Sequence, residues 1–112
     1  MNILNRGFIS VKPTTDFLNW KKSHSIEELI EPDIPEATVY LIEDEFWDEE
    51  EMLKKYFKKI AKQEFLGYSE TVESFFPNVE TVEDFLKLFT VEFGTFVIDL
   101  LKNPINSEKI DL

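Results

Sequence analysis

The chain has 112 residues, no cysteine and a net charge of −11, with 12 basic and 23 acidic side chains. This length suits one domain, and 11 Phe, 3 Tyr and 2 Trp supply the apolar surface that one core needs. The lack of Cys excludes disulfides and thiolate chemistry, and the acidic excess disfavours binding to nucleic acid or anionic membranes. No apolar stretch is long enough to span a bilayer, so we expect a cytoplasmic protein.

A strand is predicted over residues 7–12, because Ile9 and Val11 share one face and the residues between them form a wetter face. Pro13 disfavours helical geometry at the residue before it. A short helix is therefore expected to begin after Thr14 or Thr15, to carry Phe17, Leu18 and Trp20, and to end near Ser23.

The next segments contain a capping signal and a second strand. Ser25 and Glu28 have the spacing of a capping box, which predicts one or two helical turns before Pro32. Residues 37–42 are apolar at successive positions, a pattern typical of a strand covered on both faces. We therefore predict that this strand is central and that Tyr40 and Leu41 are both inaccessible.

The clearest helix is predicted to begin at Asp48 and to stop at Gly67. Its first turn is acidic and its later turns are basic, which complements the helix dipole. The basic side chains are Lys54, Lys55, Lys58, Lys59 and Lys62. An apolar stripe consists of Leu53, Tyr56, Phe57, Ile60 and Ala61. Phe57 and Ile60 are therefore predicted core residues.

The last third of the chain predicts one more helix and one more strand. Residues 68–76 fit either a short helix or an ordered loop. Thr81 and Asp84 form a capping box for a helix that runs to about Phe89. Residues 91–100 alternate as a strand, bulged or closely approached at Gly94. Residues 104–112 are expected to be a mobile tail unless Ile105 or Ile110 docks.

The order β-α-β-α-α-β predicts an α+β fold, a two-layer α/β sandwich in which amphipathic helices pack on a sheet of about three strands. Residues 1–112 are expected to form a single domain. If the first two strands are neighbours, the helical link between them should make a right-handed parallel crossover.

Several core segments of the chain resemble those of a group of small bacterial proteins of unknown function. The segments are residues 5–13 with Phe17 and Trp20, residues 38–43 and residues 55–59. They are strands and helix faces, so the resemblance implies a bacterial source and no activity.

Catalytic and metal-binding patterns are weak. Residues 43–51 contain seven carboxylates in nine positions but lack the glycine turn and ligand spacing of a calcium loop. His24 is the only histidine, and no serine has the surroundings of a nucleophile elbow. Three glycines in all leave no phosphate-binding loop. We predict no catalytic residue, no metal and no cofactor.

The leading hypothesis is a non-catalytic, acidic interaction protein that binds a basic protein partner, as an immunity protein, an inhibitor or a mimic does. Its predicted partner-binding residues are Glu45, Trp47, Asp48 and Glu49, an aromatic anchor beside steering charges. One alternative is a metal-dependent enzyme or accessory built on the carboxylates of residues 43–51. Another is a homodimer that covers the second face of the sheet.

Overall fold

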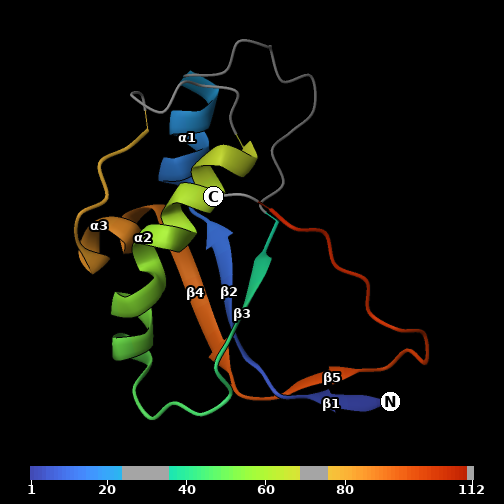
Figure 1. Cartoon of the computed structure of the whole chain (residues 1–112). Coiled ribbons are helices and arrows are strands. Elements are labelled where there is room, and N and C mark those ends of the chain that lie inside the picture. The colour runs from blue at the N-terminus through green and yellow to red at the C-terminus, as the bar shows by residue number, and fades with distance from the viewer. Residues whose placement is uncertain (24–35, 69–75, 111–112) are drawn as a thin grey trace.

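The computed structural model describes residues 1–23, 36–68 and 76–110 (Figure 1). These residues form three helices, α1 (Thr15–Ser23), α2 (Glu49–Tyr68) and α3 (Val82–Leu88), and five strands, β1 (Asn2–Leu4), β2 (Gly7–Pro13), β3 (Thr38–Ile42), β4 (Phe89–Gly94) and β5 (Val97–Asp99). His24, the predicted capping box of Ser25 and Glu28, and residues 69–75 lie outside the described part of the chain.

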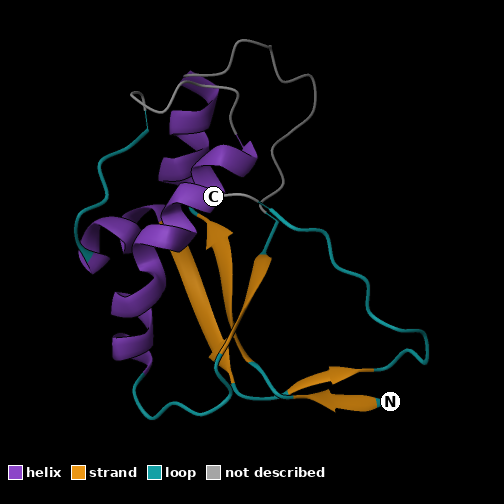
Figure 2. Cartoon of the chain, viewed as in Figure 1, coloured by secondary structure: helices purple, strands orange, loops and turns teal. Residues whose placement is uncertain are grey.

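The strands form two antiparallel sheets (Figure 2). Three strands pair in the order β3-β2-β4, and β1 pairs with β5 in a separate two-stranded sheet, called the arm below. The helices cover one face of the three-stranded sheet, and the arm projects away from this body (Figure 1). The predicted α+β architecture of two layers is confirmed, with more strands than the sequence indicated.

The core lies between the three-stranded sheet and the helices. Its buried apolar residues are Ile9, Val11, Phe17, Ile42, Leu53, Phe57, Ile60, Ala61, Phe65, Phe85 and Phe89. The fully buried Phe17 ring lies 4.9 Å from the centroid of Phe89, 5.6 Å from that of Trp20 and 5.8 Å from that of Phe65. Aromatic side chains from α1, α2 and β4 thus close one core.

The local predictions that rest on capping and periodicity are confirmed. The side chains of β2 alternate, with Ile9 and Val11 buried. Thr14 begins α1, since its side-chain oxygen accepts a hydrogen bond from the Phe17 amide at 3.5 Å. The Thr14 amide also donates to the Leu88 carbonyl at 2.8 Å, which joins the start of α1 to the end of α3. α2 ends at Tyr68, one residue beyond the expected stop.

The central position predicted for the second strand is wrong. β2 pairs on both sides, whereas β3 is an edge strand. Val39 is 57% exposed and Leu41 is 51% exposed, because both point to the sheet face that lies away from the helices. A continuous apolar run shows that a segment favours a strand, but its place in the sheet depends on partners that are distant in sequence.

The parallel crossover is also wrong, because β2 and β3 are neighbours that run antiparallel. A parallel crossover needs a helix that runs back along the sheet. The nine-residue α1 instead lies beyond the carboxyl end of β2 (Figure 1), so β3 starts at the end of the sheet where β2 stops.

The predicted last strand is divided between the two sheets. β4 ends at Gly94, and β5 begins at Val97 in the arm. The predicted close approach at Gly94 is confirmed, because a Cβ atom at this position would overlap the ring of Phe8. Residues 100–110 are exposed and run from the arm back toward β3 (Figure 1). Within the described ranges, none of the helices is both long and apolar enough to cross a membrane.

Candidate partner-binding site

Of the predicted binding residues, Glu45, Trp47 and Asp48 lie on the connection between β3 and α2, at the end of the sheet opposite α1, and Glu49 is the first residue of α2 (Figure 1). This connection comprises residues 43–48 and is called the acidic loop below. Its carboxylates continue into the first turn of α2, which carries three glutamates. Three separate contacts hold the loop to the body.

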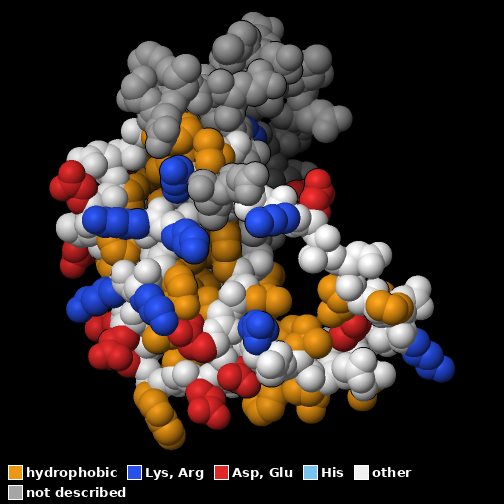
Figure 3. Space-filling view, in the orientation of Figure 1, with side chains coloured by type: hydrophobic (Ala, Val, Ile, Leu, Met, Phe, Trp, Pro, Cys, Tyr) orange, Lys and Arg blue, Asp and Glu red, His pale blue; other side chains and the backbone are white. Residues whose placement is uncertain are grey.

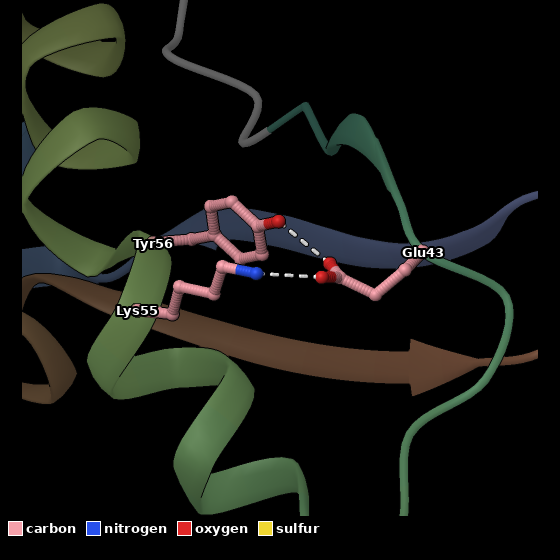
Figure 4. A network of polar contacts seen from close by, with 3 residues as sticks. All are labelled: Glu43, Lys55 and Tyr56. Atoms are coloured by element: carbon pink, nitrogen blue, oxygen red, sulfur yellow. Dashed lines mark hydrogen bonds and ion pairs between the residues drawn. The ribbon is translucent and has the colours of Figure 1, made fainter.

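The first contact joins Glu43, at the start of the loop, to α2 (Figure 4). One carboxylate oxygen of Glu43 accepts a hydrogen bond from the Tyr56 hydroxyl at 2.6 Å. The other oxygen lies 2.7 Å from the ammonium group of Lys55. Because Lys55 and Tyr56 are neighbours on α2, the two bonds fix both oxygens of a single carboxylate.

These bonds stabilise the charged form of Glu43. The hydrogen bond from Lys55, followed by the one from Tyr56, lowers the pKa of Glu43 from 4.5 to about 2. The same contact raises the pKa of Lys55 and that of Tyr56. All three groups therefore keep one protonation state at neutral pH, with Glu43 charged, Lys55 charged and Tyr56 neutral.

The second contact is at the other end of the loop, where Asp48 caps α2. Its side-chain oxygen accepts a hydrogen bond from the Glu50 amide at 2.9 Å, and its carbonyl oxygen accepts one from the Met52 amide at 3.2 Å. These bonds satisfy amide groups that the first turn of a helix leaves without partners. The predicted start of the long helix at Asp48 is therefore confirmed.

The third contact is made by Phe46, which packs against the core and lies 6.1 Å from Phe93 between ring centroids. Gly7 makes room for this arrangement. A Cβ atom at Gly7 would lie 2.8 Å from the Glu43 carbonyl oxygen and 3.1 Å from the Phe46 ring. The absence of a side chain at Gly7 thus lets the acidic loop lie directly against β2.

Trp47 points the opposite way from its neighbour and is fully exposed, with a relative exposure of 104%. Trp47 therefore does not close the core. Glu45, Asp48 and Glu49 are also exposed. The four predicted residues therefore share one accessible segment that is held at both ends. Within it, Phe46 is partly buried against the core and Trp47 faces solvent.

Charge is segregated along α2. Figure 3 shows Lys side chains gathered over this helix and acidic side chains beyond its lower end. The five lysines of α2 are all exposed. Lys55 lies four residues after Glu51 on α2, but its ammonium group contacts Glu43 of the acidic loop. The lysines thus border the acidic loop without covering it.

The sequence did not identify the set of Glu43, Lys55 and Tyr56. Glu43 was one of seven carboxylates within nine positions, and no local pattern distinguishes the one that turns toward α2. Within residues 1–23, 36–68 and 76–110, no group of three or more His, Asp or Glu side chains is arranged to hold a metal ion. The metal-dependent alternative stays a prediction for which this part of the chain offers no site.

Two further features lie between α2 and β3. Glu64 is buried, and one of its oxygens accepts a hydrogen bond from the Tyr40 hydroxyl at 2.7 Å. Burial raises the pKa of Glu64, and hydrogen bonds from Tyr40 and Thr38 act in the opposite direction. A cavity of about 430 Å³ follows the free edge of β3, with Ile110 of the tail among its lining residues.

Comparison with protein-family models, with curated protein sequences and with solved structures finds no match.

Proposed function

We propose that the protein is a non-catalytic interaction protein that binds a basic protein partner through Glu45, Trp47, Asp48 and Glu49. The observation that carries the proposal is the full exposure of Trp47 among carboxylates, next to a Phe that packs inward. A large aromatic side chain in water gains from burial, and Trp is among the residues most enriched at the centres of protein interfaces.

The loop's attachment supports a binding role, because an immobilised loop loses little conformational freedom when a partner binds. The Glu43 contact and the Asp48 cap hold the two ends, and Phe46 holds the middle. Trp47 is therefore presented from a fixed backbone. The surrounding carboxylates would raise the association rate of a basic partner through long-range attraction.

The partner expected from this chemistry is a protein with a cationic surface around an apolar pocket. We place the interaction in the cytoplasm, which is supported by a chain without cysteine. The −11 net charge supports a basic partner over an acidic one, since like charges brought together oppose association.

The test begins with crosslinking in the cell of origin and continues with binding kinetics of the isolated partner. A photoreactive amino acid in place of Trp47 should crosslink one basic protein, while the same group in place of Leu86, an exposed residue of α3, should not. With that partner in hand, Trp47→Ala should mainly speed dissociation. The double variant Glu45→Lys with Glu49→Lys should mainly slow association and weaken its salt dependence.

A matched control separates local from overall charge. Glu83→Lys with Glu92→Lys changes the net charge by the same amount at exposed positions outside the acidic loop. Asp48 is left unchanged because it caps α2. If the control slows association as much as the loop variant does, the loop has no special role. If Trp47→Ala leaves the dissociation rate unchanged, Trp47 is not an anchor.

A further inference from the structure

The arm has one apolar face that no described residue of the body covers. Ile3 of β1 and Ile98 of β5 are direct cross-strand partners, so they share one face of the two-stranded sheet. Met1, Phe96 and Leu100 directly flank the two strands, each two residues from Ile3 or Ile98, so continued alternation puts them on that same face. These five residues are called the arm face below. Their exposed fractions are 80% for Met1, 70% for Ile3, 72% for Phe96, 49% for Ile98 and 74% for Leu100.

Such a face is unusual for a chain that works alone. A two-stranded sheet is at best marginally stable in water without further packing. The opposite face of the arm, with Leu4 and Val97, is only half-buried, so the arm gains little from the body. The arm also projects away from the helices and the three-stranded sheet (Figure 1). Contiguous apolar patches of several hundred Å² usually mark an interaction site.

The area suits a specific interface. Each of these residues has a total surface on the order of 200 Å², so at their exposed fractions the five together present roughly 700 Å² to solvent. A standard protein interface takes about 800 Å² from each partner. Leu101 and Ile105, both more than half exposed, continue the apolar surface beyond the arm face.

The charged side chains of the arm indicate which kind of molecule covers the arm face. Residues 1–6 and 95–105 contain two basic side chains, Arg6 and Lys102, and one acidic side chain, Asp99, in a chain of net charge −11. The arm face itself carries no charged side chain. It therefore offers a basic partner nothing to pair with, and two acidic chains can meet there with little charge repulsion.

We propose that the arm face is the interface of a homodimer, in which the same face of a second copy packs against it. A two-fold arrangement matches an apolar face to itself, because each copy supplies the same residues. The two arms then form two sheet layers about 10 Å apart, the usual spacing of packed sheets. Because the arm projects from the body (Figure 1), the contact joins the two arms and not the two bodies.

Sedimentation equilibrium of the full chain, from about 1 to 100 µM, tests the proposal against the usual range of protein affinities. The expected mass for the wild type is twice the 13.2 kDa of one chain. Ile98→Glu would bury an unpaired charge at the interface and should raise the dissociation constant by about 100-fold or more. Leu86→Glu, an equal change at an exposed residue of α3, should leave the dimer intact.

A cysteine experiment gives a second readout that does not depend on the charged variant. The chain contains no Cys, so Ile98→Cys and Leu86→Cys each create a single thiol. Mild oxidation should link two copies through position 98 and should not do so through position 86. A monomeric wild type overturns the proposal, as does an Ile98→Glu variant that folds and stays dimeric. Equal crosslinking at both positions overturns it as well.

This inference does not rest on the proposed function, because Trp47 lies on the acidic loop and not on the arm. Trp47→Ala should leave the sedimentation mass unchanged, and Ile98→Glu should leave the photocrosslink at position 47 in place. The two proposals can therefore fail separately.

Discussion

Phe17 and Trp47 are at the extremes of exposure, so truncating them should change the stability of the protein by very different amounts. Phe17 is fully buried, and three other rings lie within 5.8 Å of its centroid. Replacing a buried Phe by Ala costs about 3–5 kcal/mol through lost burial and the cavity left behind. Each aromatic pair adds about 0.5–1.5 kcal/mol, so Phe17→Ala belongs in the upper half of that range. Trp47→Ala removes a side chain that lies in solvent, and should change stability by less than about 0.5 kcal/mol.

Urea denaturation followed by far-ultraviolet circular dichroism measures both effects, at one protein concentration because association would shift the midpoint. With a slope of about 1–2 kcal/mol/M, Phe17→Ala should lower the midpoint by roughly 2 M or more, and Trp47→Ala by less than about 0.5 M. An unchanged midpoint for Phe17→Ala would mean that α1 does not close the core. A loss above about 1 kcal/mol for Trp47→Ala would mean that Trp47 packs on the body, and its binding role would lose its support.

Three smaller changes test single polar contacts. Glu64→Gln should stabilise the protein at neutral pH, because burial raises the pKa of Glu64 and the folded state pays for its charge there. In stability measurements against pH, this advantage should disappear below about pH 4.5, where the wild-type carboxyl is protonated in both states. Titration of the Glu43 carboxyl followed by carbon-13 NMR should give a pKa of about 2, and Lys55→Met should return this pKa toward 4.5. The contact of Glu43 with Lys55 and Tyr56 therefore stabilises the fold above pH 4.5, and this stabilisation is lost as the pH falls through about 2. Thr81→Ala should lower the free energy of unfolding by about 1 kcal/mol in urea denaturation, because the Thr81 side chain caps α3 in a capping box with Asp84.

The features that sequence predicted correctly are local. Thr81 and Asp84 are three residues apart, and Asp48 lies two residues before the amide that it caps. The apolar stripe of α2 follows the helical period, so Phe57 and Ile60 are buried as expected. In each case the residues that determine the structure are within a few positions of each other, and periodicity or capping chemistry is enough.

The features that sequence missed depend on distant pairs. Ile3 pairs with Ile98, and a three-residue strand with so remote a partner has no signature of its own. The edge position of β3 follows from the pairing of β2 with β4, which only the folded chain reveals. The same holds for the adjacent aromatics of the acidic loop. Phe46 turns inward because Gly7 and Phe93 make a place for it, and Trp47 is left outside.

The two exposed apolar surfaces differ in the charges around them, so salt should affect them in opposite directions. Trp47 stands among carboxylates, and attraction to a basic partner would be screened as the Debye length falls from about 10 Å at 0.1 M salt to about 3 Å at 1 M. Partner association should therefore slow as salt rises. Two copies of a chain with net charge −11 repel each other, and screening weakens that repulsion while the uncharged arm face keeps its apolar attraction.

The dimer should therefore become tighter over the same range of salt, as sedimentation equilibrium would show. Phosphate-free sodium chloride is the appropriate salt, because strongly excluded salts such as sulfate also strengthen apolar burial directly. Ile98→Glu supplies the control, since a chain that has lost the arm interface should stay monomeric at every salt concentration. If the wild-type dimer instead dissociates as salt rises, ion pairs hold it together. The interface would then lie where the lysines of α2 could meet the acidic loop of a second copy, and not on the arm.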